Sequence, residues 1–369
     1  MNKVMIAAAG TGGHVFPALA VAEKLRSYGW QVVWLGTTEQ RLEAKVVPAA
    51  GFTLEQIDMQ GMRGHGLLRK LMTPWRLFKA VRQSRKLLRK HQSQLLLTFG
   101  GYVCGPAGVA ARSLGIPLLV HEQNAVAGLT NKLLARMAQH VMVGFAAAKQ
   151  QLPGAEVTGN PLRAQWAQPH ASANPTEQPL RLLIVGGSLG AQALNQSVPA
   201  ALAQLPVALL QQLQVQHQCG AQQTAAVQQA YQALPLAEVQ VQEFIEDMHS
   251  AYQQATVVIC RAGALTVAEL AVLATPAIFV PLPHAVDDHQ TANANELVSI
   301  GAARLLPQPQ LQQVSPLVAL LEELLSQPEV RQQMRQQAAS LARVDATEAV
   351  VNQCERWANP EQLTAGNRL

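Results

Sequence analysis

The chain has 369 residues, of which 49% are hydrophobic and 14% charged, and this length predicts two domains rather than one core. No run of 18 uninterrupted apolar residues indicates a transmembrane helix, and the first residues lack the basic start and cleavage site of a signal peptide. Four scattered cysteines without metal or disulfide spacing favour a reducing cytoplasm and argue against a structural zinc site.

The net charge of +5 hides a division between the two halves of the chain. Residues 1–165 hold 20 Lys and Arg against 7 Asp and Glu, a balance of +13, whereas residues 166–369 hold 8 against 16, a balance of −8. Between Asp58 and Glu122 there are eleven basic residues and no acidic one. Such asymmetry indicates an anionic partner for the first half only.

A short apolar run near the start of the chain leads into a glycine-rich turn. We predict a strand at Val4–Ala9, a turn at Gly10–Gly13, and a helix from Pro17 to Tyr28. Proline suits the first turn of a helix, where its missing N–H is not needed. The next strand, Gln31–Leu35, completes the βαβ unit of a parallel sheet.

The second half of the chain repeats this order, with a strand at Leu180–Val185, the turn GGSLGA, and a helix over Ala191–Ala203. Two βαβ units predict an α/β protein with two doubly wound parallel-sheet domains. Further short strands, apolar on both faces, are predicted at Leu95–Thr98, Pro117–His121, Val141–Val143, Val239–Gln242, Val257–Cys260 and Ala277–Val280.

The domain boundaries that we expect are 1–163 for the first domain, 164–340 for the second, and 341–369 for a helical segment that packs back on the first. The glutamine-rich stretch Gln211–Gln254 is interpreted as helices with solvated, uncharged faces. The stretch Pro328–Ala358 is interpreted as terminal helices.

Four glycine-rich turns follow predicted strands and open helices: GTGGH (10–14), TFGGYVCGP (98–106), VGGSLGA (185–191) and CRAGALTVAEL (260–270). Glycine lets the backbone approach a ligand closely, and a helix N-terminus offers free N–H groups to an anion. Any one such turn is equally well explained as purely structural. The ligand crevice of open α/β sheets lies at the strand C-termini, so all four turns are expected to line one cleft between the domains.

The turns differ from the two common nucleotide motifs. The dinucleotide fingerprint needs a third glycine at a fixed offset, and a Walker loop needs Lys-Ser/Thr, so a dehydrogenase is disfavoured. Ser188 lies where a hydroxyl can join amides around a phosphate. Glu269 suits the two hydroxyls of a ribose, or else stabilises the helix dipole. His14 is either a general base at the crevice or a structural histidine.

Other polar residues follow predicted strands. His121, Glu122, Gln123 and Asn124 form one such group, and Arg163 is a further polar candidate in the predicted domain junction, Gly159–Arg163. The run from 281 to 294 contains several His, Asp, Gln and Asn residues. Its spacing matches no standard metal site, so we favour contacts with sugar hydroxyls.

The basic stretch Arg63–Lys90 interleaves ten Lys and Arg with Leu, Met, Trp and Phe. Nucleic-acid binding is one interpretation, and an amphipathic face on anionic lipid is another, favoured by Trp and Phe. A crossover helix with a charged outer side is the structural alternative, which applies at least to Gln83–Lys90.

Seven motifs together resemble the MurG family of bacterial peptidoglycan N-acetylglucosaminyltransferases, within glycosyltransferase family 28. They are, in the family's order, GTGGHVFPALAVA, GGYVCGP, HEQN…GLTNK, GNPLR, IVGGSLGA, EFIEDM and CRAGALTVAEL, and the resemblance runs from Lys3 to Ala349. It implies a GT-B fold, in which two Rossmann-like domains face each other across a deep cleft. The first domain would face the acceptor and the membrane, and the second would bind UDP-N-acetylglucosamine (UDP-GlcNAc).

The activity that the resemblance implies is inverting transfer of GlcNAc to the C4 hydroxyl of N-acetylmuramic acid (MurNAc) in undecaprenyl-pyrophosphoryl-MurNAc-pentapeptide (lipid I). The product is lipid II, which serves cell-wall growth, cell shape and division. No cofactor, metal or nucleic acid is implied. The expected partners are the donor, lipid I, an anionic membrane surface at Arg63–Lys90, and a cell-wall synthesis complex, at the cytoplasmic face of the inner membrane, where the protein would be peripheral.

The substrate-binding positions implied by the family's motifs are Thr11, Gly12, Gly13, Asn124, Arg163, Ser188, Ile245, Ala264, Leu265, Thr266, Val267, Ala268, Glu269 and Gln290. The first three would meet either the donor or the acceptor pyrophosphate, and Asn124 and Arg163 would contact the donor. Ser188, with Ala264 and Leu265, would hold the diphosphate. Ile245 would pack on uracil, Glu269 would take the ribose hydroxyls, and Gln290 those of GlcNAc. His14 is the candidate general base.

The chain departs from the family pattern at Cys104 and Ala262, where serine is common, and at Leu189, where glutamine is frequent. An alternative function is another UDP-sugar enzyme on the same scaffold, such as a UDP-GlcNAc 2-epimerase. A non-catalytic nucleotide or nucleic-acid binder is the alternative from another class.

Overall fold

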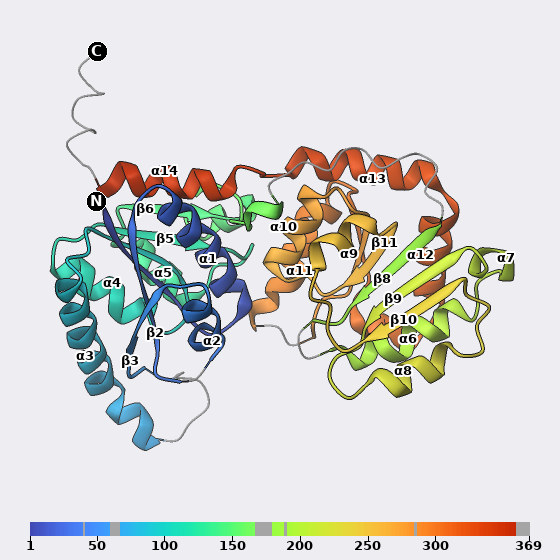
Figure 1. The fold of residues 1–369 in the computed structure, drawn as a ribbon, viewed down its shortest axis with the longest axis horizontal. Helices are drawn as coiled ribbons and strands as arrows, with labels where there is room; N and C mark the ends of the chain where they lie inside the picture. Colours follow the sequence, from blue (N-terminus) through green and yellow to red (C-terminus); the bar gives the residue numbers. More distant parts are fainter. Residues whose placement is uncertain (40, 60–66, 167–178, 188–189, 284–285, 359–369) are drawn as a thin grey trace, which may run out of the picture. The chain divides into compact units, whose positions relative to one another are not determined.

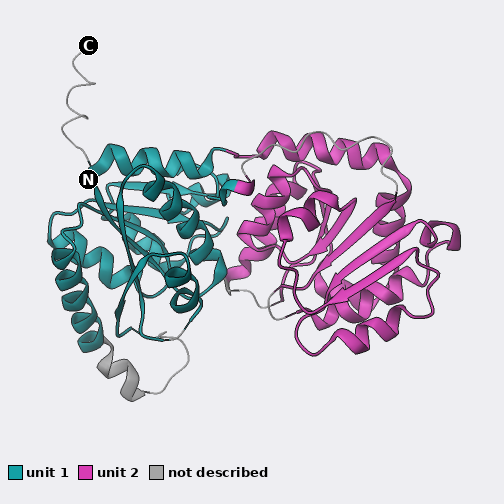
Figure 2. Ribbon diagram, in the orientation of Figure 1, with its two compact units in different colours: residues 1–164, 345–369 teal, residues 165–344 magenta. Residues whose placement is uncertain are grey.

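The computed structural model describes residues 1–39, 41–59, 67–166, 179–187, 190–283 and 286–358 (Figure 1). It divides into two compact units. Unit 1 comprises residues 1–164 and 345–369, and unit 2 comprises residues 165–344 (Figure 2).

Within the described residues, unit 1 is built on a seven-stranded parallel sheet with the strand order β3-β2-β1-β4-β5-β6-β7. Its strands are β1 (Lys3–Ala8), β2 (Gln31–Thr37), β3 (Thr53–Ile57), β4 (Leu95–Gly100), β5 (Leu118–Glu122), β6 (His140–Val143) and β7 (Glu156–Val157). Its helices are α1 (Gly12–Ser27), α2 (Leu42–Ala49), α3 (Leu67–Lys90), α4 (Cys104–Ser113), α5 (Leu129–Ala135) and α14 (Ala346–Ala358), with a 3-10 turn η1 (Ala146–Gln150).

The central strand β1 is buried on both faces, as its apolar run KVMIAA predicts. Because successive side chains of a strand point to opposite faces, Val4 and Ile6 enter one core cluster and Met5 and Ala7 enter the other. The first cluster contains residues of α1 and α14, and the second contains residues of α3 and α4. Both faces of the sheet are therefore covered by helices.

Helix α1 begins at Gly12, so the predicted start at Pro17 is wrong. Pro17 lies inside the helix, where it supplies no N–H to the carbonyl four residues before it. Two glycines open the first turn, and the residues that follow are mostly buried. Packing of this buried face against the sheet outweighs the cost of one missing hydrogen bond.

Helix α14 is the last described element of the chain and belongs to unit 1. It packs against α1, and its Val350, Val351 and Cys354 are completely buried in the same cluster as the apolar face of α1. Lys24 forms a 2.9 Å ion pair with Glu348, which also accepts a hydrogen bond from the Tyr28 hydroxyl. The terminal helix thus completes the core of the first unit.

Unit 2 holds a six-stranded parallel sheet in the part of the chain that is described, with the order β10-β9-β8-β11-β12-β13. Its strands are β8 (Leu180–Val185), β9 (Leu213–Gln218), β10 (Glu238–Gln242), β11 (Val257–Cys260), β12 (Ala277–Phe279) and β13 (Ala303–Leu305). Its helices are α6 (Gln192–Leu202), α7 (Val207–Leu210), α8 (Thr224–Tyr231), α9 (Met248–Gln254), α10 (Ala264–Val272), α11 (His289–Val298), α12 (Ser315–Ser326) and α13 (Pro328–Leu341). Short 3-10 turns are η2 (Ala164–Trp166), η3 (Val286–Asp288) and η4 (Gln308–Gln312).

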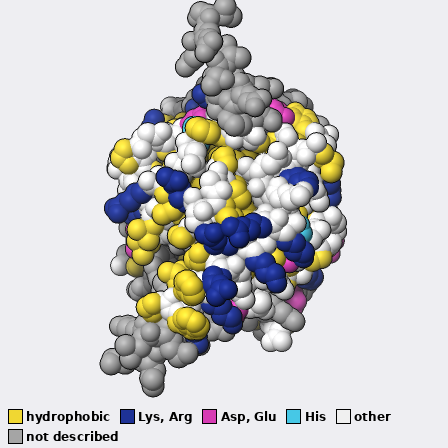
Figure 3. Space-filling model, turned by 90° about the vertical axis from the view of Figure 1, so that its left-hand side faces the viewer, with side chains coloured by type: hydrophobic (Ala, Val, Ile, Leu, Met, Phe, Trp, Pro, Cys, Tyr) yellow, Lys and Arg dark blue, Asp and Glu magenta, His cyan; other side chains and the backbone are white. Residues whose placement is uncertain are grey.

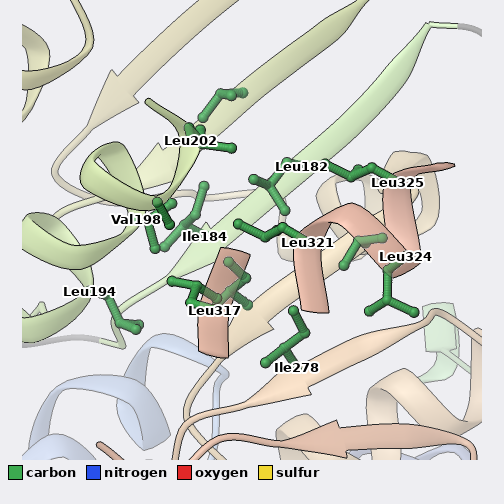
Figure 4. Packing of buried hydrophobic residues seen from close by; sticks show 14 of the residues in the cluster. Leu182, Ile184, Leu194, Val198, Leu202, Ile278, Leu317, Leu321, Leu324 and Leu325 are labelled. Atoms are coloured by element: carbon green, nitrogen blue, oxygen red, sulfur yellow. The ribbon is translucent and has the colours of Figure 1, made fainter. Parts of the chain in front are cut away.

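Leucine-rich packing joins α12 and α6 to one face of the second sheet (Figure 4). Helix α12 reads SPLVALLEELLS, and its buried residues recur at the spacing of one helix face. The side chains gathered there are Leu182, Ile184, Leu194, Val198, Leu202, Ile278, Leu317, Leu321, Leu324 and Leu325.

The predicted fold class, α/β with two doubly wound parallel-sheet units, is confirmed. The interpretation of Gln211–Gln254 as helices is wrong in part, because Leu213–Gln218 is strand β9. Its sequence LQVQHQ alternates apolar and polar residues, which is the strand period of two. The strands β3, β7 and β13 are also absent from the predictions, and each is short.

Leu321→Ala tests the α12 core. Leu321 is completely buried, so truncation removes apolar contacts and leaves a cavity, and we expect the unfolding free energy to fall by about 2–5 kcal/mol. Urea unfolding measures this loss. Val207→Ala, at a side chain 58% exposed in the same unit, is the control and should change it by less than about 0.5 kcal/mol. Equal effects of the two changes would contradict the packing described here.

Candidate active site

The four glycine-rich turns lie at the topological switch points of the two sheets. In unit 1 the strand order runs from β1 toward one edge of the sheet and from its neighbour β4 toward the other edge. In unit 2 it runs in the same way from the neighbours β8 and β11. Each of these strands ends in one of the turns. Ligands of open α/β sheets bind outside the carboxyl ends of strands at such a point. Each unit therefore carries a candidate ligand site built from a pair of turns.

The first turn of unit 1 leaves helix amides unoccupied by any capping side chain. Thr11 is the N-cap residue of α1, with extended backbone and no side-chain hydrogen bond to the helix. Its carbonyl accepts hydrogen bonds from the N–H groups of His14 and Val15. The first amides of a helix have no partner within it, so those of Gly12 and Gly13 suit an anion. The contacts of Thr11, Gly12 and Gly13 with a pyrophosphate stay a prediction.

His14 lies between the two glycine turns of unit 1. Its Nδ1 donates to the carbonyl oxygen of Ala9 over 3.3 Å. Its ring lies against Gly100, where an added Cβ would come within 2.8 Å of Nε2, and Gly100 has φ +117°. Only glycine combines this backbone conformation with room for the ring. The close packing holds the imidazole at the switch point.

Glu43 supports the first turn of unit 1 through a hydrogen bond, and this role was not predicted from the sequence. It lies in the first turn of α2 and is completely buried. Its Oε2 accepts a 3.0 Å hydrogen bond from the Gly10 N–H, and its Oε1 accepts one of 3.0 Å from the Thr37 hydroxyl. A buried acid 33 residues from its partner gives no local sequence signal.

The polar group at the end of β5 and directly after it is mostly structural. His121 donates from Nε2 to the carbonyl of Gly159, and its Nδ1 accepts from the Gln123 amide. Burial lowers the pKa of His121 to about 4, so the ring is neutral. The Glu122 carboxylate, 2% exposed, holds the following loop and accepts from the backbone N–H and side-chain amide of Asn124.

Asn124 is the member of this group that reaches the surface, because it is half-buried while the three residues before it are buried. Arg163 is exposed and lies beside α1, with its guanidinium 5.8 Å from the centre of the Phe16 ring. The preceding Leu162 is tied to α14 through two hydrogen bonds with the Thr347 hydroxyl, of 3.1 and 2.8 Å. The roles of Asn124 and Arg163 in donor binding stay predictions.

Cys104, which stands where serine is common in the family, still supports the turn after β4. The Cys104 thiol is buried and donates to the carbonyl of Gly100 at 3.0 Å and that of Ala7 at 3.2 Å. Burial raises its thiol pKa to about 12, so it stays protonated. A serine hydroxyl would have the same hydrogen-bonding role.

In unit 2 a glutamine side chain supports the first glycine turn. The Gln218 amide accepts from the Gly187 N–H at 3.1 Å and donates to the carbonyls of Gly187 at 2.8 Å and Glu243 at 3.2 Å. It therefore joins this turn to the segment after β10. Ser188 and Leu189 lie outside the described residues.

Gly190 ends that turn against the backbone of Cys219, since an added Cβ would lie 2.4 Å from the Cys219 carbonyl oxygen. A buried chain of hydrogen bonds holds the same carbonyl. The Asn195 amide donates to it, His217 donates to Asn195 from Nε2, and the Tyr231 hydroxyl donates to His217 Nδ1 at 2.7 Å. Burial lowers the pKa of His217 to about 4. This chain also lacked a sequence signal.

Helix α10 presents its N-terminus at the second turn of unit 2. Gly263 is the N-cap residue and has no side chain to cap the amides of Ala264, Leu265 and Thr266. Val267 lies behind them: its side chain is 1% exposed and its N–H bonds the Gly263 carbonyl.

The side chains of α10 divide between core and surface. The Thr266 hydroxyl hydrogen-bonds the buried Tyr252, so Thr266 offers a ligand its backbone rather than its side chain. Ala268 and Glu269 are half-buried, the latter one and a half turns into the helix. Glu269 as a ribose ligand stays a prediction.

Two further predicted contacts of unit 2 lie on the loop after β10 and in the first turn of α11. Ile245 is 5% exposed and follows the exposed Phe244, and its contact with uracil stays a prediction. Gln290 accepts a 2.9 Å hydrogen bond from the Leu282 N–H through its side-chain oxygen. The Asn293 amide, which is buried, donates to the carbonyl of Ala262. Among the described residues no group of three or more His, Cys, Asp and Glu is arranged to hold a metal ion.

Two family models match the chain. The glycosyltransferase family 28 N-terminal domain matches residues 4–143, and the glycosyltransferase family 28 C-terminal domain matches residues 181–350. A relative from Idiomarina loihiensis is 54% identical over 362 residues, which are 97% of this chain and 99% of the relative. Its name is UDP-N-acetylglucosamine--N-acetylmuramyl-(pentapeptide) pyrophosphoryl-undecaprenol N-acetylglucosamine transferase.

Two solved structures have similar folds. The crystal structure of Acinetobacter baumannii MurG has a TM-score of 0.82 and 41% identity, and the match covers 96% of this chain and 100% of that one. A UDP-GlcNAc 2-epimerase from Neisseria meningitidis, bound to UDP-GlcNAc, has a TM-score of 0.67 over 96% and 100% of the two chains. Its identity is 13%, so it shows the fold alone.

The buried His217 predicts an acid-sensitive stability. Its pKa is about 4 in the folded protein and about 6.5 when unfolded, so the unfolded chain binds more protons between these values. The stabilisation is complete above pH 6.5 and is lost as the pH falls toward 4, at about 1.4 kcal/mol per pH unit. We expect His217→Gln to remove this share of the slope when unfolding free energy is measured from pH 7 to 4.5. A slope identical to that of the unmodified protein would show that His217 is not buried as a neutral ring.

Proposed function

The chain belongs to glycosyltransferase family 28, and on that premise we propose that it transfers GlcNAc from UDP-GlcNAc to the C4 hydroxyl of MurNAc in lipid I, giving lipid II for peptidoglycan synthesis. The observation that carries the proposal is the relative named for this transfer, which is 54% identical and aligns with 97% of the chain. The resemblance indicated by the seven motifs is confirmed by this relative and by the two family matches.

Unit 2 supplies the donor site in this proposal. The amides of Ala264, Leu265 and Thr266 at the start of α10 suit the diphosphate, because a helix N-terminus attracts negative charge. Glu269, farther along the same helix, accepts hydrogen bonds from the ribose hydroxyls. Ile245 lies against the uracil. The glycine turn held by Gln218 supplies further amides at the neighbouring strand end.

Unit 1 supplies the acceptor site. The uncapped amides of Gly12 and Gly13, with Thr11, contact the acceptor pyrophosphate. His14 then lies one residue beyond the phosphate-binding amides. Asn124 and Arg163 contact the donor, and Gln290 of unit 2 binds the GlcNAc hydroxyls.

The reaction is a single displacement at the anomeric carbon. The acceptor O4 attacks C1 as the bond from C1 to the UDP oxygen breaks, which converts an α-linked donor into a β1,4 linkage. The O4 proton passes to Nε2 of His14, the nitrogen that carries the lone pair when Nδ1 donates to Ala9. Negative charge develops on the departing UDP, where backbone amides fixed in advance stabilise it most.

The membrane surface is proposed to contact α3. Residues 63–66 of the basic stretch lie outside the described residues, and its side chains are described from Pro74 onward. Ala80, Ser84 and Leu88 form the buried stripe of the helix, which packs on α4. This part of the stretch is therefore a crossover helix with one packed face.

The opposite face of α3 mixes aromatic and basic side chains. Trp75 is 66% and Phe78 is 51% exposed, with ring centres 5.8 Å apart. A shallow groove along the helix is lined by Trp75, Phe78, Lys79, Arg82, Gln83, Arg85, Lys86 and Arg89. Figure 3 shows Lys and Arg gathered with hydrophobic side chains on this side of the molecule. Aromatic rings among basic groups favour an anionic lipid surface.

None of the helices in the described ranges is long and apolar enough to cross a membrane. Attachment through α3 would make the protein a peripheral membrane protein. At the cytoplasmic face of the inner membrane it would reach its lipid acceptor. The epimerase alternative is supported only by a likeness of fold at 13% identity.

Transfer is tested with labelled UDP-GlcNAc and a lipid I analogue. We expect label in a butanol-extractable product only when the acceptor is present; conversion of UDP-GlcNAc alone would instead support an epimerase.

His14→Ala should lower kcat by ~10² to 10⁴-fold with little change in donor KM, because it removes a general base. Glu269→Ala should mainly raise donor KM instead, because Glu269 is proposed to bind the ribose of the donor. Unchanged turnover in His14→Ala would remove the histidine from the mechanism.

Membrane binding is tested by flotation with vesicles of phosphatidylglycerol and phosphatidylcholine. Trp75→Ala and Phe78→Ala should each weaken binding roughly tenfold or more, since a buried aromatic side chain contributes about 1.5–3 kcal/mol. Raised salt should weaken it further by screening the basic groups. The control Val207→Ala, an exposed apolar residue of unit 2, should not change flotation. Binding that is indifferent to both salt and the aromatic changes would refute the α3 surface.

A further inference from the structure

We propose that Glu43, the peptide group between Ala9 and Gly10, and His14 form one hydrogen-bonded relay that fixes the tautomer of His14 and strengthens it as a base. The inference rests on the proposed function, since it assigns Glu43 as a positioning residue for the proton transfer to His14. Glu43 acts through the peptide group and does not touch substrate.

The relay uses both ends of a single peptide group. The Gly10 N–H donates to Glu43 Oε2 at 3.0 Å, and the carbonyl of Ala9, which belongs to the same peptide unit, accepts from His14 Nδ1 at 3.3 Å. The N–H and C=O of a trans peptide point in opposite directions, so this unit can bridge two side chains on its two sides. Glu43 and His14 are thereby connected although neither touches the other in these bonds.

The direction of each bond follows from the chemistry of its partners. A carbonyl oxygen only accepts, so His14 Nδ1 must carry a hydrogen, and in the neutral ring the lone pair then lies on Nε2. At the other end, N–H and O–H donors reach both oxygens of Glu43, from Gly10 and Thr37. Two donors suit a carboxylate that only accepts. The relay therefore runs from a negative group to the proton on Nδ1.

The negative charge of the Glu43 carboxylate distinguishes the relay from a side chain that only supports the loop. Glu43 is completely buried, and burying a carboxylate is costly, whereas a neutral amide could hold the Gly10 N–H equally well. Hydrogen bonds in a chain polarise one another, so a carboxylate on the N–H makes the Ala9 carbonyl a stronger acceptor. A stronger acceptor at Nδ1 favours the Nδ1–H tautomer and stabilises the imidazolium that forms during proton transfer. The buried aspartate of a serine-protease triad has the same effect by direct contact.

Two glycines fix the ends of the relay. An added Cβ on Gly36 of β2 would lie 3.1 Å from the Glu43 Cγ, and one on Gly100 of β4 would lie 2.8 Å from His14 Nε2. Strands β2 and β4 flank β1, which ends at Ala8, one residue before this peptide group. A guanidinium nitrogen of Arg41, which pairs with Glu39, would lie 3.7 Å from a Cβ added to Gly10.

The test is Glu43→Gln in the full-length protein, which keeps the shape and the acceptor for Gly10 but removes the charge. We expect kcat to fall about tenfold, a part of the 10² to 10⁴ that a general base supplies, with donor KM unchanged. Nitrogen-15 NMR of the His14 ring, assigned by comparison with His14→Gln, should show the Nε2–H tautomer increasing. Glu43→Asp retains the charge on a shorter side chain. Its kcat and its tautomer ratio should both lie between those of the unmodified protein and those of Glu43→Gln. The control Glu156→Gln, at a carboxylate bonded to His140 and Gln353 in the same unit, should change neither.

The readouts separate this inference from the proposed function. An unchanged tautomer in Glu43→Gln overturns the relay, even if kcat falls, whereas a tautomer shift at unchanged thermal stability supports it, because a loss of loop structure would also lower the thermal stability. A tautomer shift with full turnover in His14→Ala supports the relay and overturns the base assignment. Absence of any transfer by the unmodified protein overturns the proposed function, while the NMR comparison still decides the relay.

Discussion

Backbone contact between neighbouring turns is the constraint on which both sites depend. In unit 1 an added Cβ on Gly101 would lie 2.6 Å from the Ala9 carbonyl oxygen, and in unit 2 one on Gly190 would lie 2.4 Å from that of Cys219. These distances leave no room for a side chain, so the turn after β4 can approach that after β1, and the turn after β8 can approach the end of β9, only through glycine. At each switch point the turns lead into helices, α1 and α4 in unit 1 and α6 and α10 in unit 2, and the N-terminus of a helix suits an anion.

The two units support their first turn with different chemistry. Unit 1 uses the Glu43 carboxylate, whereas unit 2 uses the neutral Gln218 amide, which donates and accepts at the same residue. Under the proposed function this difference has an electrostatic reason. A negative charge behind the turn favours a histidine that becomes positive, and the turn of unit 2, which carries no histidine, is held by a neutral amide instead. The same backbone arrangement is thus supported by a charge where a base is proposed and by an uncharged group where none is.

The sequence predicted what depends on local pattern. Apolar runs followed by glycine identified β1, β4, β8 and β11, and with them the two switch points. Strand β9 was missed because its outward positions are glutamine and its inward ones include a histidine, so the apolar signal is weak. Glu43 and Gln218 were missed because each bonds a partner more than thirty residues away, which composition and spacing do not report. His14 was identified only because it adjoins a glycine turn.

The return of α14 to unit 1 has a consequence for synthesis on the ribosome. The apolar face of α1 is covered by Val350, Val351 and Cys354, which are among the last described residues of the chain. Unit 1 is therefore discontinuous, and its core stays open while the whole of unit 2 is being made. Domains usually fold as they emerge, the N-terminal one first. Here the inserted unit can reach its native state before the unit that began earlier, and completion of the first core waits until α14 has been made.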